Sequence, residues 1–197
     1  MGFTHYFDRP NKQLRNISLA KRKKIVPIVQ KIVSRYAAIL TGDCNGETRE
    51  PVILTLESDA ICFNGIGDDS HESFFFPWVM DSELNGFDFC KTARKPYDDP
   101  VMEILIVLKH FIPGLKVRSD GFGTKDCPCR NPEINWIKAA RRVRNLYGIV
   151  TTLFYWESYP APGTKVKRGG NRVPVLAGTA NDFAVAIEPF RRVIRRS

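Results

Sequence analysis

Long apolar runs are absent from this sequence of 197 residues. No stretch approaches the roughly 20 apolar residues that a helix needs to cross a bilayer, and the N-terminal segment contains no apolar core of a secretory signal. We therefore expect a cytoplasmic protein that makes no contact with a membrane. Hydrophobic residues still make up 43% of the chain and aromatic residues 11%, which predicts a folded protein with a real core.

Paired metal-ligand motifs and a phosphate loop are also missing. The five cysteines show no regular spacing, and only Cys127 and Cys129 lie one residue apart. Structural zinc usually needs two ligand pairs at wider spacing, so we expect no metal and no other cofactor. An odd number of cysteines without a secretory signal favours a reducing compartment. The segment "GIGDDS" lacks the G-x4-G-K-[ST] form of a phosphate loop.

Excess positive charge is confined to the C-terminal part of the sequence. Residues 137–197 hold 12 Lys and Arg against 3 Asp and Glu, which accounts for the whole net charge of +9. From about residue 157, Pro, Gly and cations dominate, as is typical of loops. We therefore expect a core domain at residues 1–156 and a basic C-terminal extension at 157–197, able to meet phosphates or acidic surfaces.

The order of apolar patterns predicts an α+β fold. Helical spacing and helix-start residues predict three helices, at 18–40, 99–112 and 131–147. Short apolar or alternating runs predict strands at 52–56, 60–64, 73–78, 87–92, 115–119, 149–156 and 183–187. Most of these strands precede the second helix, which favours a single mixed or antiparallel sheet of about five to seven strands over a doubly wound parallel sheet.

Polar residues gather in three segments at predicted strand ends or loops, where binding groups tend to lie. The segment "CKTARKPY" combines cations, a hydroxyl and an aromatic ring, which are the groups that bind the phosphates and the base of a nucleotide. The segments "GDDSHE" and "RSDG" and the N-terminal "THYF" add further polar groups. The residues that we expect to bind a ligand are Lys91, Thr92, Arg94, Lys95, Tyr97, His71, Glu72, Ser119, Asp120 and His5.

Each segment also has a purely structural interpretation. In that interpretation the cations of "CKTARKPY" belong to a solvated loop and pair with Asp98, Asp99 and Glu103. The segment "GDDSHE" is then a polar hairpin turn. Neighbouring side chains of a strand face opposite ways, so Glu72 would point away from His71 and would not share a site with it. Cys90 is either a thiolate favoured by the adjacent cations or a buried structural cysteine.

Four separated motifs resemble those of a family of small uncharacterised phage and bacterial proteins. They are "THYF" where the family has THYW, "FNG" followed by "HESF", "FCKTARKPYD", and "KHF" followed by "SDG" where the family has KHH. The resemblance covers about residues 1–122, with Phe7 and Phe111 as departures. It implies a phage-type protein that works in the host cytoplasm and carries a polar site. The defining positions it implies are Thr4, His5, Tyr6, Asn64, Gly65, His71, Glu72, Cys90, Lys91, Thr92, Arg94, Lys95, Tyr97, Asp98, Lys109, His110, Ser119, Asp120 and Gly121.

Three functional hypotheses follow. The first is a phage-type protein that binds a phosphorylated small molecule of the nucleotide type and so sequesters a signalling nucleotide of the host. The second is a nucleic-acid-binding protein that uses the basic C-terminal region, with Arg141, Arg142, Arg144, Lys165, Lys167 and Arg168. The third is a metal-dependent enzyme of phosphate chemistry that uses Asp69, His71 or Glu72 as ligand or base. The sequence leaves the ligand, any reaction and the oligomeric state open.

Overall fold

The computed structural model describes residues 2–80, 86–122 and 134–151, and the backbone of two short strands at 155–158 and 172–175. These residues form three α-helices, two three-stranded antiparallel sheets and one further strand pair. The predicted α+β class is therefore confirmed. The strands divide between separate sheets, however, where the sequence predicted a single one. No helix in the described part of the chain is long and apolar enough to cross a membrane.

The two sheets lie edge to edge. The first has the order β5-β1-β6, with bounds β1 Thr4–Asp8, β5 Phe87–Lys91 and β6 Lys116–Ser119. The second has the order β2-β3-β4, with bounds β2 Leu40–Thr41, β3 Ala60–Gly65 and β4 Phe74–Pro77. A backbone hydrogen bond of 3.3 Å from Glu72 N to Lys91 O joins them at one end. The third pair consists of β7 Tyr155–Ser158 and β8 Arg172–Val175.

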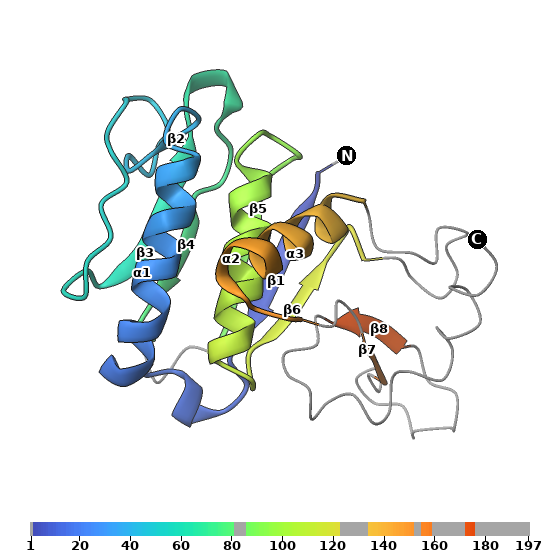
Figure 1. Cartoon of the computed structure of the whole chain (residues 1–197). Helices are drawn as coiled ribbons and strands as arrows, with labels where there is room; N and C mark the ends of the chain where they lie inside the picture. The colour runs from blue at the N-terminus through green and yellow to red at the C-terminus, as the bar shows by residue number, and fades with distance from the viewer. Residues whose placement is uncertain (1, 81–85, 123–133, 152–154, 159–171, 176–197) are drawn as a thin grey trace.

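Three helices lie in front of the sheets, with α2 between α1 and α3 (Figure 1). Their bounds are α1 Leu19–Arg35, α2 Asp98–Phe111 and α3 Ile134–Tyr147, and two short 3-10 turns are η1 Lys12–Leu14 and η2 Gly67–Asp69. The sequence predicted one buried stripe on the second helix. Instead every side chain of α2 from Val101 to Lys109 is buried, because the sheet covers one side of α2 and a helix covers each flank.

Two predicted strands differ in the structure. The segment 52–56 is not a strand, because the side chain of Gln30 on α1 accepts a hydrogen bond of 3.0 Å from Leu54 N and takes the place of a neighbouring strand. In the predicted strand 149–156, residues 149–151 are irregular, residues 152–154 lie outside the described part of the chain, and β7 spans Tyr155–Ser158. The predicted strand 183–187 lies outside the described residues. The domain boundary after residue 156 stays a prediction.

Among the described elements, helices cover one face of the sheets and not the other (Figure 1). Strand side chains that point toward the helices are fully buried, as Phe63, Phe74 and Phe76 show. Side chains on the opposite face alternate with them and remain accessible, so that Phe75 and Phe89 are each 47% exposed. Because alternate side chains of a strand point to opposite faces of a sheet, exposed aromatic rings lie on the face away from the helices.

Candidate functional site

Four segments that are distant in sequence meet at one end of the sheets. Thr4 in β1 pairs with Lys91 at the end of β5, and Asp120 N donates a hydrogen bond of 3.0 Å to Thr4 O. The segment before β4 joins β5 through Glu72, and Lys95 Nζ donates to Asp68 O in the turn η2. We call this end the polar rim and define it as residues 2–5, 67–73, 90–98 and 119–121. It brings together all the segments that the sequence predicted to bind a ligand.

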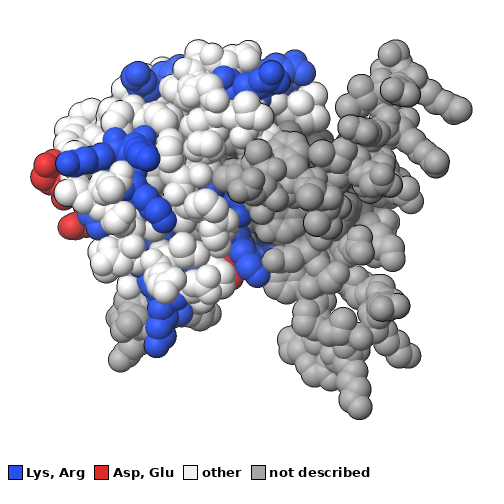
Figure 2. All heavy atoms as spheres, turned by 60° about the horizontal axis from the view of Figure 1, so that its bottom comes forward, with Lys and Arg blue, Asp and Glu red and all other residues white. Residues whose placement is uncertain are grey.

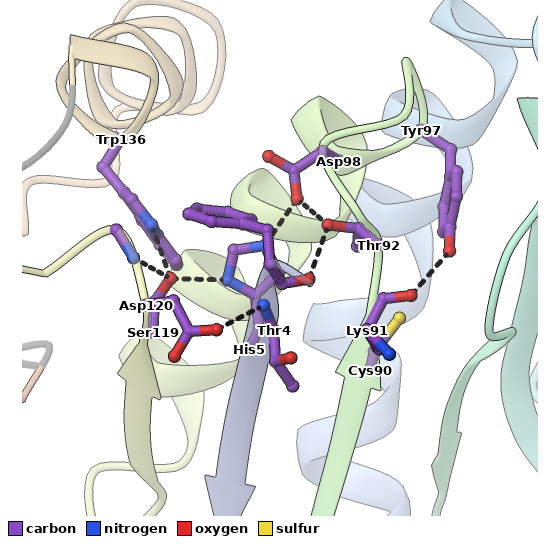
Figure 3. A network of polar contacts seen from close by, with 12 residues as sticks. Thr4, His5, Cys90, Lys91, Thr92, Tyr97, Asp98, Ser119, Asp120 and Trp136 are labelled. Carbon is purple, nitrogen blue, oxygen red and sulfur yellow. Dashed lines mark hydrogen bonds and ion pairs between the residues drawn. The ribbon is translucent and has the colours of Figure 1, made fainter. Parts of the chain in front are cut away.

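The centre of the polar rim is a buried hydrogen-bond network around His5 (Figure 3). The His5 side chain is fully buried, with Nε2 2.6 Å from Asp98 Oδ1 and Nδ1 2.9 Å from Ser119 Oγ. The Thr92 hydroxyl donates to the same Asp98 oxygen. The network therefore joins β1 to the start of α2, to β6 and to the loop after β5.

The donors around Ser119 determine the direction of its hydrogen bond to His5. Ser119 Oγ accepts hydrogen bonds from Trp136 Nε1 at 3.2 Å and from Gly121 N at 3.1 Å, which occupy both of its lone pairs. Its own proton must then be donated to His5 Nδ1. The other ring nitrogen, Nε2–H, donates to Asp98. Each polar atom of the His5 ring therefore has a partner.

This connection of Ser119, His5 and Asp98 is similar to that of a nucleophilic triad, but it does not provide a nucleophile. Both lone pairs of the serine oxygen are bound by N–H groups, and none remains to attack a substrate. All three residues are at least nine-tenths buried. The network is therefore a structural support that fixes the strand ends, and His5 and Ser119 do not reach a ligand from their present positions.

Two further predicted site residues are also structural. The Tyr97 side chain is fully buried, and its hydroxyl donates to Glu72 O at 2.7 Å, so it does not stack on a base as the sequence predicted. Glu72 Oε2 accepts a hydrogen bond of 2.8 Å from Lys91 N. Burial raises the pKa of both Tyr97 and the neighbouring Cys90 thiol. The interpretation of Cys90 as a buried structural cysteine is thereby confirmed.

The loop cations do not pair with the carboxylates that the structural interpretation assigned to them. Asp98 is bound by His5, and Asp99 Oδ2 lies 3.1 Å from Arg142 Nη2. Glu103 is bound by Arg142 and by a second arginine, Arg35, on α1. All three carboxylates nearest to the loop in sequence therefore have partners elsewhere, and the solvated-loop interpretation is wrong in its pairing.

The three loop cations lie at the outer edge of the polar rim. The guanidinium carbon of Arg94 lies 4.1 Å from the centroid of the Phe3 ring, a cation–π distance. Ala93 and Arg94 have φ angles of 50° and 61°, a left-handed turn that non-glycine residues adopt only at a cost. Lys91 and Lys95 form no ion pair with any residue that the structure describes.

The predicted ligand-binding residues therefore fall into two groups. The residues that are exposed or half-buried at the polar rim are Lys91, Arg94, Lys95, His71 and Asp120. The residues whose side chains form hydrogen bonds to other groups of the rim are His5, Thr92, Tyr97, Ser119 and Glu72. Sequence reasoning missed the contributions of Asp98 and Trp136 to the network. In the sequence, Asp98 is a defining position of the resemblance and a possible partner of the loop cations, but it was not predicted as a residue of the site.

The structure gives no support to a metal centre at "GDDSHE". Asp69 and His71 are exposed, and the described residues contain no group of three His, Cys, Asp or Glu side chains that could hold a metal ion. Cys127 and Cys129 lie outside the described residues. A groove of about 550 Å³ lies elsewhere, between α1 and the segment 49–53, and no predicted site residue lines it.

The residues predicted to bind nucleic acid are only partly described. Arg141 and Arg144 are exposed on α3, but Arg142 is bound by Asp99 and Glu103 and is not available for a phosphate. Lys165, Lys167 and Arg168 lie outside the described residues. Figure 2 shows the end of the molecule at which α1 begins, where Lys and Arg lie at several places and Asp and Glu at few. Positive charge on the described surface is therefore not confined to α3.

The three described thiols differ in accessibility and should differ in reactivity. Cys44 is exposed, Cys62 is half-buried and Cys90 is buried. Burial, and then the hydrogen bond and charge of neighbouring Cys44, raises the pKa of Cys62 to about 12. Because the thiolate is the reactive form, we expect iodoacetamide at pH 8 to modify Cys44 first, Cys62 far more slowly and Cys90 only after unfolding. Peptide mass spectrometry with and without urea measures this order, and rapid modification of Cys90 in the folded protein would contradict it.

Comparison of the chain with protein-family models, with curated proteins and with solved structures finds no match.

Proposed function

We propose that this protein binds a phosphorylated small molecule of the nucleotide type at the polar rim. The observation that carries the proposal is that two cations of this region have no ion-pair partner among the described residues. Asp98 is hydrogen-bonded to His5 and Thr92, and Asp99 and Glu103 are paired with Arg142 and Arg35, whereas Lys91 and Lys95 have no ion pair among the described residues. An anion that binds beside Lys91 and Lys95 would therefore meet two cations that no described carboxylate pairs with.

The geometry of the loop supports phosphate binding in particular. Arg94 offers a planar fork for two phosphate oxygens, and its contact with the Phe3 ring holds it near the backbone turn. Lys95 is held at the turn by its hydrogen bond to Asp68 O and contributes a point charge beside it. The buried network fixes the backbone from which these side chains extend, so a ligand would not have to order the loop first.

In a phage-type protein, such a site would serve to sequester a signalling nucleotide of the host. Sequestration requires tight binding and no chemistry. That requirement agrees with the state of His5 and Ser119 in the rim, because both side chains are fully engaged in hydrogen bonds with other parts of the protein. The exposed His71 lies in the same rim and could add a third type of donor to a ligand.

Ligand-induced stabilisation tests the proposal. We expect a cognate nucleotide at about 100 times its Kd to stabilise the protein by about 2.7 kcal/mol, which corresponds to a rise in Tm of about 5–10 °C for a chain of this size. A panel of mononucleotides, cyclic dinucleotides and inorganic phosphate can be screened by differential scanning fluorimetry. Native mass spectrometry of the freshly purified protein would detect a nucleotide that co-purifies.

Substitutions at the rim make the test specific. The double variant Arg94→Gln and Lys95→Gln should lose most of the rise in Tm, while Lys23→Gln, an exposed lysine on α1, should keep it. Equal stabilisation of the rim variant and the wild-type protein would show that the ligand binds elsewhere. If no phosphorylated compound raises the Tm and none co-purifies, the proposal is wrong.

A further inference from the structure

Aromatic side chains are concentrated on the face of the sheets opposite the helices. Tyr6 in β1 lies directly opposite Phe89 in β5 in the strand register, and Phe87 follows on the same face. The ring centroids of Tyr6 and Phe87 are 6.2 Å apart with an interplanar angle of 25°, and those of Phe87 and Phe89 are also 6.2 Å apart. Phe89 is 47% exposed and Phe87 is 39% exposed. The three rings therefore form a continuous, accessible row across two strands.

Cations border this row of rings. Arg118 in β6 pairs with Tyr6, and Lys116 in β6 pairs with Asp8, so both belong to the same face. Lys91 lies two residues beyond Phe89 on the same side of β5. The face also carries two carboxylates. Asp8 lies between Phe87 and Lys116 in the strand register, and Asp120 already accepts a hydrogen bond of 2.9 Å from Thr4 N. The aromatic rings of β5 and β1 thus lie between Lys91 at the end of β5 and the two cations of β6.

A contiguous exposed apolar surface usually marks an interaction site, and here it has the chemistry of one class of partner. Each nucleotide of a single strand carries a flat base that can stack on an aromatic ring and a phosphate that can contact a cation.

We propose that this sheet face binds single-stranded nucleic acid. Bases stack on Tyr6, Phe87 and Phe89, and phosphates lie beside Lys91, Lys116 and Arg118. Such binding tolerates many sequences, because every base offers a flat face, and it weakens with salt, because bound phosphates release counterions. The inference shares Lys91 with the nucleotide site of the polar rim, but it does not rest on that site, since all three stacking residues lie outside the rim.

Fluorescence anisotropy with a labelled oligo-dT of about 15 nucleotides, at about 50 mM salt, tests the inference on the full chain. Phe89→Ala should weaken binding by about tenfold or more, because one stacked base is lost. The control Leu146→Ala removes a side chain that is 55% exposed on α3 and should leave the affinity unchanged. Arg118→Gln should reduce the slope of log affinity against log salt by about 0.7, the value for one phosphate contact of a single strand.

A measurement on the wild-type protein makes the test independent of the folding of any variant. Photocrosslinking with 5-iodouracil oligonucleotides, followed by mass spectrometry, should place crosslinks on β1 or β5. Crosslinks found only in residues 137–197, unchanged affinity of Phe89→Ala, or no binding at low salt would each overturn the inference. Sedimentation that shows a dimer dissociated by Phe89→Ala would also overturn it. The rim variant with Arg94→Gln and Lys95→Gln should keep crosslinks on β1 and β5, so the two proposals can fail separately.

Discussion

Replacement of Asp98 by alanine is expected to lower the free energy of unfolding by about 3–5 kcal/mol. The substitution leaves the buried His5 Nε2–H and the buried Thr92 hydroxyl without an acceptor, and each unsatisfied buried donor costs about 1–3 kcal/mol. It also removes a negative charge from the first turn of α2, where it interacts favourably with the helix dipole. The loss is a large share of the stability of an ordinary domain, which is about 5–15 kcal/mol. Urea denaturation monitored by circular dichroism measures it.

Asp99 provides a matched control for this prediction. It is the adjacent residue in the same helical turn, but its side chain is 38% exposed, and its partner is the surface-accessible Arg142. Asp99→Ala should therefore cost no more than about 1 kcal/mol, the usual value of an accessible ion pair. Asp98→Asn keeps one acceptor oxygen and should lie between the two alanine variants. If Asp98→Ala and Asp99→Ala are equally stable, the buried network does not hold the strand ends together.

Local signals predicted the helices well because helix starts and stops are encoded in neighbouring residues. The combination of Asp99 and Pro100 predicted the start of α2 to within two residues. Gly148 predicted the end of α3, and the structure shows it with a φ of 68° and its N–H bonded to Arg144 O at 2.9 Å. The prediction of a strand at 52–56 failed because its outcome depends on Gln30, a distant side chain.

The candidate site was predicted in location but not in the burial of its members. The sequence placed the polar segments at strand ends, and the structure brings those ends together. It could not show that β1 runs between β5 and β6, because strand pairing depends on long-range register. That central position buries His5 and makes it a structural residue. Trp136, which contacts Ser119 from α3, lies in a region where the sequence offered no related pattern.

The helix layer contains a second buried polar centre, at Glu103 in the middle of the molecule. The Glu103 side chain is fully buried on α2, and it accepts hydrogen bonds from Arg35 and Tyr36 at the end of α1 and from Arg142 on α3. One carboxylate therefore connects all three helices. The two arginine side chains are each 31% exposed, so the pairs are accessible at their outer ends and buried at the carboxylate.

Glu103→Gln should lower the free energy of unfolding by about 3 kcal/mol, toward the lower end of the cost of breaking a buried ion pair by removal of one partner. The substitution is costly because the amide nitrogen of glutamine must face the N–H groups of the arginines. The cost stays at the lower end because both arginines can turn outward to water. Glu57→Gln, on an exposed loop, is the matched control and should change stability by no more than about 0.5 kcal/mol. Urea denaturation of both variants measures the difference.

The same substitution has a spectroscopic consequence at Tyr36. Burial, and then the hydrogen bond and charge of Glu103, raises the pKa of Tyr36 to about 12. Removal of the carboxylate charge should lower that pKa toward, but not to, the ordinary value of 10, because the burial remains. Ultraviolet difference titration at alkaline pH, with Tyr36→Phe to assign the signal, measures this shift. A variant that loses stability while the pKa of Tyr36 is unchanged would show that Glu103 acts on the fold through packing alone and not as the charged centre that joins the three helices.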